Sequence, residues 1–208
     1  MSILFITGAG LSVASGIPTY HGEGGLYNGI EVERLLHISN VCRHPEVVDQ
    51  IFDTVRFDAN PNKAHHLIAE LCRTRKHLVA TQNVDGLHQK ADITTKVLEL
   101  HGNIHQQRRL PNTNYDVPNV VFFGEDPKHL PEVFAFAKKA KYVVTIGTES
   151  SFRYIRHMIA SCKQRGGTHI DINPATTALN TTMEPTSKHT HLKTNAIHGM
   201  EVLETLLD

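Results

Sequence analysis

The stretch that decides the fold is Ile3–Tyr27, which reads ILFITGAGLSVASGIPTYHGEGGLY. It opens with an apolar run, Ile3 to Ile6, whose length and β-branched content predict a buried strand. The turn Thr7-Gly8-Ala9-Gly10 follows at once, and we expect a helix after it. In α/β sheets this arrangement presents free backbone N–H groups to phosphate. The stretch therefore predicts a diphosphate-binding loop, with a tight structural turn as the less favoured alternative.

The loop lacks the full fingerprint of a hydride-transferring dinucleotide enzyme. That fingerprint has a third glycine where this chain has Val13, and an acidic residue about twenty positions further on, at the end of a second strand. Glu31 and Glu33 lie near that distance, but no strand is expected before them. The loop is therefore not predicted to serve an ordinary dehydrogenase.

The composition indicates a globular chain with one sizeable core, since 40% of its 208 residues are hydrophobic. Basic and acidic residues number 21 each, so nothing indicates a nucleic-acid or anionic-membrane surface. Cys42, Cys72 and Cys162 form no C-x-x-C pair, which argues against a disulfide framework and a cysteine-built zinc site. No run reaches membrane-spanning length and no signal peptide is visible, so we expect a cytoplasmic protein.

Apolar runs alternate with helical patterns along the rest of the chain. Strands are expected over 78–81, 97–100, 120–123, 142–146 and 170–172, and helices over about 64–71, 131–139, 152–162 and 200–207. Such alternation predicts a parallel sheet covered on both faces, a Rossmann-like α/β fold. We assign residues 1–29, 77–102 and 118–208 to this part, and 30–76 and 103–117 to a reduced helical small module.

Polar or glycine clusters follow five of the expected strands, where parallel sheets bind ligands. They are Gly8-Ala9-Gly10, Gln82-Asn83-Val84-Asp85, His101, Gly147-Thr148 and Asn173. Asn83 and Asp85 could hold a carboxamide, a ribose or a water, and ordinary turn chemistry is an equal alternative for this pair. His101 is a candidate general base near neutral pH. Its spacing from His105 does not indicate a metal site, because no helix and no further ligands are expected there.

Several of these motifs carry a family resemblance. The run Gly8-Ala9-Gly10-x-Ser12-x-x-Ser15-Gly16-Ile17-Pro18-Thr19 resembles the opening motif of the sirtuins, NAD-dependent protein deacylases. Residues 81–88 (TQNVDGLH) resemble the family's most distinctive motif, and Glu99-Leu100-His101-Gly102 resembles its catalytic histidine motif. Residues 61–65 (PNKAH) and 120–125 (VVFFGE) are similar to its helix opening and to the segment that pairs with the acyl-lysine peptide. The motifs cover most of the chain in the right order.

The resemblance implies that NAD is a co-substrate consumed in the reaction. Asn83 and Asp85 would organise the nicotinamide side, the acyl oxygen of a modified lysine would attack the ribose, and His101 would deprotonate a ribose hydroxyl. The implied NAD-binding residues are Gly8, Ala9, Gly10, Ser12, Pro18, Thr19, Tyr20, Gln82, Asn83, Asp85, Gly147, Thr148 and Asn173. The implied peptide-binding residues are Val121, Phe122, Phe123 and Gly124.

Three departures from the family keep other functions open. Sirtuins usually carry two C-x-x-C pairs before the Phe-Gly-Glu segment, whereas residues 103–119 contain no cysteine and are too few for a zinc ribbon. Tyr20-His21 replaces the usual Phe-Arg, and Glu149 replaces a usual serine. A deacylase is the implied activity. The missing zinc module favours NAD hydrolysis or ADP-ribosyl transfer as the alternative, and the other two departures favour a non-catalytic NAD or ADP-ribose sensor.

The cysteine pattern predicts a fold that needs no metal. We expect a chelator to leave the melting temperature unchanged, because a structural zinc site would couple metal removal to unfolding. Thermal melts with and without EDTA, together with metal analysis of the purified protein, check this. Stoichiometric zinc combined with a chelator-lowered melting temperature would contradict it.

Overall fold

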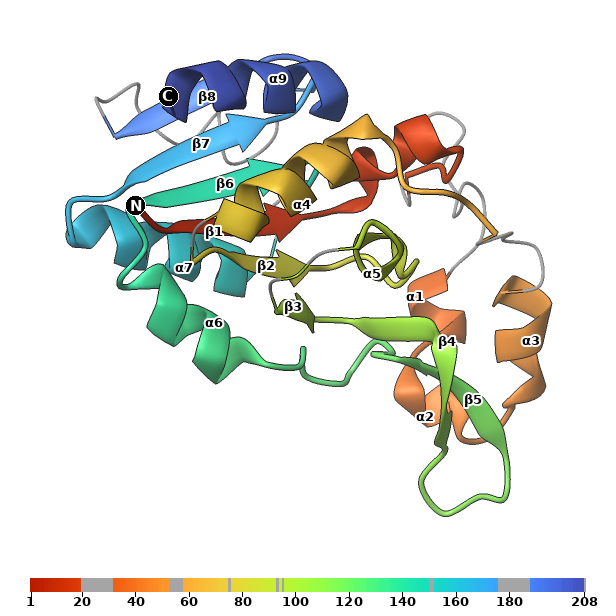
Figure 1. The fold of residues 1–208 in the computed structure, drawn as a ribbon. Coiled ribbons are helices and arrows are strands. Elements are labelled where there is room, and N and C mark those ends of the chain that lie inside the picture. Colours follow the sequence, from red (N-terminus) through yellow and green to blue (C-terminus); the bar gives the residue numbers. More distant parts are fainter. Residues whose placement is uncertain are drawn as a thin grey trace.

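A computed structural model describes residues 1–19, 32–52, 58–74, 76–92, 94, 96–149, 152–175 and 188–207 (Figure 1). Its strands are β1 (Ile3–Thr7), β2 (Leu78–Thr81), β3 (Val97–Glu99), β4 (Gly102–Arg109), β5 (Asp116–Val120), β6 (Tyr142–Ile146), β7 (Thr168–Ile172) and β8 (His189–Leu192). Its α-helices are α1 (Val32–Leu35), α2 (Ile38–Val41), α3 (Glu46–Phe52), α4 (Lys63–Thr74), α5 (Leu87–Lys90), α6 (Leu130–Ala137), α7 (Arg153–Gln164) and α9 (Ala196–Leu207).

Six strands form one parallel sheet in the order β3-β2-β1-β6-β7-β8. β1 lies in the middle, with Thr7 opposite both Thr81 of β2 and Ile146 of β6. The two remaining strands, β4 and β5, pair antiparallel in a separate hairpin. The Rossmann-like fold predicted from the apolar runs is confirmed.

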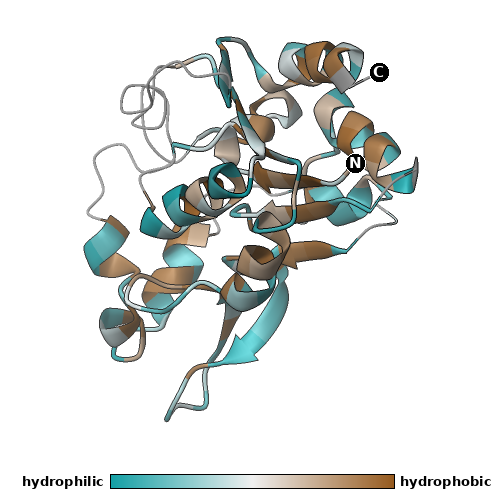
Figure 2. Ribbon diagram, turned by 90° about the vertical axis from the view of Figure 1, so that its left-hand side faces the viewer, coloured by the Kyte–Doolittle hydropathy of each residue, from teal (hydrophilic) through white to brown (hydrophobic). Residues whose placement is uncertain are grey.

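Both faces of the sheet are covered, because alternate side chains of each strand enter different cores. Leu4 and Ile6 of β1 pack with α6 and α7, whereas Ile3 and Phe5 pack with α4 and α9. Figure 2 shows the strands as hydrophobic segments between these helices. A strand that is buried on both sides reads as a continuous apolar run, and all five residues of β1 are buried.

Helix α4 belongs to the layer that covers the sheet, although it lies in the range 30–76 expected to form the small module. Its residues Ala64, Ile68 and Cys72 recur at helical spacing and pack in the core with Phe5. The helix begins as expected after Asn62, whose Oδ1 accepts the Ala64 N–H at 2.9 Å. The apolar face of α4 therefore packs against the parallel sheet.

The small module has its own core between α1–α3 and the β4–β5 hairpin. Its buried residues include Val32, Val41 and Val48 from the helices and Val117 from β5. A strand was expected over 120–123 as one of the apolar runs of the parallel sheet, but β5 ends at Val120 and pairs with β4. Apolar character alone could not distinguish these two pairings.

Two further elements differ from the sequence expectation. The helix expected after the glycine turn is replaced by two 3₁₀ turns, η1 (Ala9–Leu11) and η2 (Val13–Ser15). Strand β8 (His189–Leu192) is polar and was not expected, yet it pairs with β7 at the sheet edge. An edge strand needs less apolar surface than a central one, which is why its pattern gave no signal.

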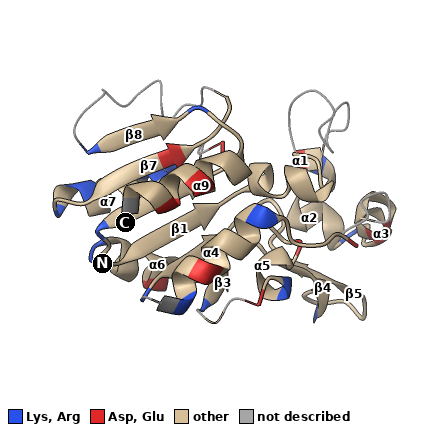
Figure 3. Cartoon of the chain, turned by 45° about the horizontal axis from the view of Figure 1, so that its top comes forward, with Lys and Arg blue, Asp and Glu red and all other residues tan. Residues whose placement is uncertain are grey.

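Charged residues are interspersed on the described elements drawn in Figure 3, with both signs on the outer helices. No helix of the described residues is long and apolar enough to cross a membrane. The same residues contain no cluster of three or more histidine, cysteine, aspartate or glutamate side chains arranged to hold a metal ion.

The fold buries two histidines in contact, which predicts a loss of stability in mild acid. The rings of His65 and His88 lie 5.1 Å apart between centroids, and burial lowers the pKa of His65 to about 4 and that of His88 to about 3. Both values lie below the unfolded pKa of about 6.5, so the unfolded chain binds more protons as pH falls through that value. Each histidine should then cost roughly 1–2 kcal/mol of stability by pH 5.

Urea unfolding at neutral pH and in mild acid measures this effect. We expect His88→Asn to lose part of the acid-dependent drop in unfolding free energy. The exposed His157 provides a control, His157→Gln, that should keep the wild-type dependence. Equal acid dependence in His88→Asn and the wild type would show that His88 is not the proton-sensitive group.

Candidate active site

The C-terminal ends of five parallel strands lie along one edge of the sheet. Backbone hydrogen bonds continue past the ends of the strands: Gln82 donates to the carbonyl of Thr7 and Gly147 to that of Ile172, both at 2.9 Å. These bonds extend the register of the sheet into the loops. The five clusters singled out in the sequence therefore emerge side by side.

The loop after β1 and the loop after β6 touch through their backbones. A Cβ on Gly10 would lie 2.6 Å from the Gly147 Cα, and one on Gly8 would lie 2.7 Å from the Gly147 carbonyl oxygen. Gly147 itself has φ +57°, in the left-handed region. The glycines are thus required for loop-to-loop contact, a reason that the sequence did not reveal.

The amides of these glycines were expected to be free for a phosphate, and this expectation is wrong for two of them. The Gly8 N–H donates to the Ile146 carbonyl at 3.0 Å, and the Gly10 N–H donates to the Gly147 carbonyl at 2.9 Å. The loop also begins a 3₁₀ turn and not an α-helix. Anion binding by a helix N-terminus is therefore not the basis of this site.

A buried polar cluster lies beneath the glycine loop. Ser12 donates its hydroxyl to Asp85 Oδ2 at 2.7 Å, and Asp85 Oδ1 accepts the Leu87 N–H at 3.0 Å. Asn83 Nδ2 donates to the Gly8 carbonyl at 3.1 Å and to the Ser12 hydroxyl at 3.2 Å. Each of these three polar side chains is almost fully buried. These hydrogen bonds connect Asn83 and Asp85, from the loop after β2, to the glycine loop after β1.

One atom of this cluster is an acceptor with no partner. Asn83 Oδ1 is buried and makes no hydrogen bond within the described structure. A buried polar atom left unpaired costs free energy, about 1–3 kcal/mol, and a donor from a bound molecule would recover it. A carboxamide N–H, such as that of nicotinamide, has the chemistry to do so.

His101 lies two residues after the end of β3, the strand paired with β2. Its Nε2 is 3.1 Å from the hydroxyl of Tyr154, which also accepts a hydrogen bond from Gln82 Nε2 at 3.1 Å. The Phe152 ring packs edge-on against the imidazole, with 5.7 Å between centroids. Burial lowers the pKa of His101 to about 4, and a hydrogen bond with the Gln82 backbone opposes this shift. The ring is therefore neutral at physiological pH.

The loops after β6 and β7 are joined to the same network. Thr148 donates its hydroxyl to Gln82 Oε1 at 2.6 Å, and Asn173 Nδ2 donates to the Thr148 carbonyl at 3.1 Å. Glu149, which departs from the family pattern, is exposed at the end of this loop. The residues expected to reach the distal ribose thus contact residues expected near the nicotinamide.

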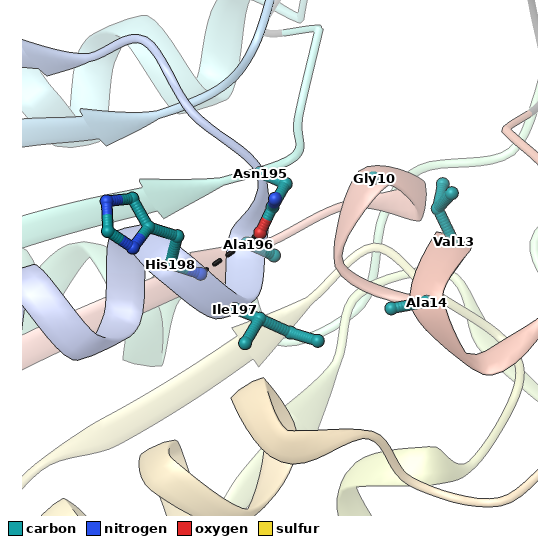
Figure 4. Close-up of a pocket in the computed structure, with 7 residues that line it drawn as sticks. All are labelled: Gly10, Val13, Ala14, Asn195, Ala196, Ile197 and His198. Atoms are coloured by element: carbon teal, nitrogen blue, oxygen red, sulfur yellow. Dashed lines mark hydrogen bonds between the residues drawn. The ribbon is translucent and has the colours of Figure 1, made fainter.

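A cavity of about 340 Å³ opens next to the glycine loop (Figure 4). It lies between the 3₁₀ turns, with Gly10, Val13 and Ala14, and the start of α9, with Asn195, Ala196, Ile197 and His198. Asn195 caps that helix, because its Oδ1 accepts the His198 N–H at 3.0 Å. The cavity is lined mostly by apolar atoms.

The expected peptide-binding segment lies between the sheet and the small module. The Phe123 N–H donates to the Leu36 carbonyl at 3.0 Å, and the Phe123 carbonyl accepts the Ile38 N–H at 2.8 Å. The Val121 N–H donates to the His101 carbonyl at 2.8 Å, which ties the segment directly to the histidine. Phe122 is buried, whereas Phe123 is 37% exposed.

The family follows from comparison with known proteins: the model of the Sir2 family matches residues 8–117, more than half of the chain. The chain belongs to the Sir2 family. A protein named NAD-dependent protein deacylase from Aquifex aeolicus is 31% identical over 206 residues, covering 86% of each chain. NAD-dependent protein deacylase 1 of Archaeoglobus fulgidus is 34% identical, covering 85% of this chain and 83% of the relative.

Solved Sir2 structures share the whole fold. A Sir2 homologue in complex with NAD superposes with a TM-score of 0.83 at 28% identity, covering 100% of this chain and 91% of that one. A mutant Sir2 homologue bound to ADP-ribose gives a TM-score of 0.84 at 28% identity, covering 99% and 93%. This Sir2 chain therefore keeps the family's architecture although it has no C-x-x-C pair.

Most predicted site residues of this Sir2 chain lie along the sheet edge, but some are not placed there. Pro18 is exposed and Thr19 half-buried at the end of a described range, and Tyr20 lies outside the described residues. Sequence reasoning missed Tyr154, and also Asn62, whose Nδ2 donates to the Leu11 carbonyl at 2.8 Å. The only signal for Tyr154 was an aromatic residue soon after the Gly147-Thr148 loop.

The loop contact predicts the effect of Gly10→Val. The valine side chain would meet the Gly147 backbone as well as the space expected for the diphosphate. We expect weaker NAD binding together with a loss of about 1–3 kcal/mol of stability, typical of overpacking. Calorimetric NAD titration and thermal melts measure both. Arg156→Ala, on the exposed face of α7, is the control, and native values in Gly10→Val would contradict the contact.

Proposed function

We propose that this Sir2-family chain is an NAD-dependent protein-lysine deacylase that releases nicotinamide and O-acyl-ADP-ribose. The observation that carries the proposal is that His101 follows β3 while the buried Asn83 and Asp85 follow the paired strand β2, at the sheet edge where Asn83 also bonds the glycine loop. Curated relatives that match more than four fifths of the chain bear the name NAD-dependent protein deacylase. The three free cysteines suit the reducing cytoplasm, where we propose that the enzyme acts.

The residues present fit NAD as a co-substrate. The unpaired Asn83 Oδ1 offers an acceptor to the nicotinamide carboxamide. The Asp85 carboxylate is linked to Asn83 through the Ser12 hydroxyl, which is hydrogen-bonded to both. The cavity beside Gly10 offers an apolar surface to the adenine end. Thr148 and Asn173, which are hydrogen-bonded to each other, would contact the ribose of that end.

His101 would act as the base on a ribose hydroxyl. With a pKa of about 4 the imidazole is neutral, so a lone pair is available across the physiological range. Rates limited by this group should therefore stay flat above about pH 5.

An acyl-lysine peptide is the proposed second substrate. Residues 121–124 run beside His101, and Phe123 exposes part of its ring there. The backbone N–H and C=O groups of Phe122 and Phe123 are already hydrogen-bonded within the chain, so the exposed part of the Phe123 ring is the surface that a peptide would contact. The side chain of the acyl-lysine would then extend toward His101.

NAD hydrolysis or ADP-ribosyl transfer is the second candidate. It is favoured by the replacement of the two C-x-x-C pairs with the short β4–β5 hairpin, since a smaller module offers less surface to a peptide. The two candidates differ in one respect: a hydrolase would release nicotinamide without any acylated peptide.

The division of roles predicts different effects at the two ends of the site. We expect His101→Ala to lose deacylation by about 10²–10⁴-fold, the usual contribution of an acid–base group, while nicotinamide exchange is retained. Asn83→Ala and Asp85→Asn should instead impair exchange, because these residues face the leaving group. The Asp85→Asn change keeps an acceptor for the Leu87 N–H, and its amide nitrogen can donate to the Ser12 hydroxyl oxygen, which limits damage to the fold.

Nicotinamide exchange and peptide deacylation, both followed by chromatography with labelled nicotinamide, check these expectations. Thermal melts of each variant control for folding. No exchange and no nicotinamide release by the wild type with any acyl-lysine peptide would refute the deacylase proposal. Release that needs no peptide and depends on Asn83 and Asp85 would identify a hydrolase.

A further inference from the structure

Tyr154 reaches the proposed catalytic histidine from an element that no sequence motif marks. It is the second residue of α7, and its ring packs partly into the core under the sheet. The ring stacks on Phe152 with 5.4 Å between centroids, which fixes its direction. Its hydroxyl lies 3.1 Å from His101 Nε2 and 3.1 Å from Gln82 Nε2.

The hydrogen bonds around this hydroxyl determine where its proton goes. Thr148 donates to Gln82 Oε1 at 2.6 Å, so the amide nitrogen of Gln82 points at the phenol and donates to it. A phenol has one proton, and with Gln82 as its donor the proton is free to be given to His101 Nε2. The other ring nitrogen of His101 must then carry the imidazole proton, and a hydrogen bond with the Gln82 backbone raises the pKa of His101, as expected when the ring is the donor.

We propose that Tyr154 is a positioning residue for the deacylation reaction: its phenol holds His101 as the neutral Nδ1–H tautomer with the Nε2 lone pair directed into the site. The proposal rests on the proposed function for its catalytic meaning, but the tautomer itself is a property of the protein without substrate. A substrate hydroxyl would replace the phenol at Nε2 and find the lone pair already oriented.

The surroundings of His101 make the phenol its main side-chain partner. Gln82 from the loop after β2, Phe152 just before α7 and Tyr154 in its first turn surround the ring, and none of the three is charged at neutral pH. Burial and the Gln82 backbone account for the shift in the pKa of His101, with no contribution from a charged side chain among the described residues. Removing the phenolic hydroxyl should therefore change the state of His101 without a competing ion pair.

Tyr154→Phe isolates the hydroxyl, and Tyr142→Phe is the matched control, since Tyr142 lies at the opposite end of β6. Nitrogen-15 NMR of the histidine rings reports which nitrogen is protonated, and a His101→Gln spectrum identifies the His101 signals among the fifteen histidines. We expect an unprotonated Nε2 in the wild type and in Tyr142→Phe. Tyr154→Phe should show mixed tautomers and a His101 pKa raised by roughly 0.5–1 unit, since a hydrogen bond to the neutral ring is lost.

Activity provides the second readout. We expect Tyr154→Phe to lower the kcat of deacylation several-fold and shift the acid limb of its pH profile upward, with the KM for NAD little changed. A wild-type Nε2 that carries the proton would overturn the proposal, whether or not the variant folds. Identical ring signals in Tyr154→Phe and the wild type would also overturn it. If the wild type shows no deacylation while the tautomer shift is observed, the proposed function fails and the positioning role of Tyr154 stands.

Discussion

The structure depends on a contact between two backbones. The loops that leave β1 and β6 approach so closely at Gly8, Gly10 and Gly147 that no side chain fits between them. The Gly8 and Gly10 amides of the first loop donate to the carbonyls of Ile146 and Gly147, at the end of β6. These hydrogen bonds join the two loops. Neighbouring strands of a parallel sheet carry their loops at the same edge, so this contact fixes the relative position of two loops that border the candidate site.

The candidate site is organised by hydrogen bonds more than by ion pairs. Ser12, Asn83 and Asp85 support the glycine loop from below, while Thr148, Gln82 and Tyr154 form a chain that ends on His101. Burial keeps the imidazole neutral, and a neutral imidazole has a defined donor and a defined acceptor nitrogen. In such a site the direction of each hydrogen bond matters as much as its length.

The small module is held without cysteine pairs by a compact polar contact. Arg108 of β4 lies 2.5 Å from the Glu125 carboxylate, and its guanidinium sits 5.1 Å from the centre of the Phe122 ring. The same Glu125 oxygen accepts the Phe122 N–H at 2.9 Å. Because both charged side chains are about three quarters buried, this contact is screened less than a surface ion pair. It connects the hairpin to the segment that leads to His101.

The sequence by itself determined the parallel sheet and indicated the family, and it supplied the candidate site residues. Strands buried on both faces are continuous apolar runs, and the polar residues after them must meet at one edge, which is why His101, Asn83 and Asp85 could be named in advance. Only the tertiary structure decided what depends on neighbours distant in the chain. Gly8 and Gly10 must be glycines because Gly147 packs against them. Strand β5 leaves the main sheet because it pairs with β4. The hydrogen-bond partner of His101 is Tyr154, fifty-three positions away. A local sequence pattern indicates which face of its own strand or helix each residue occupies. Packing between distant elements determines which side chains come into contact.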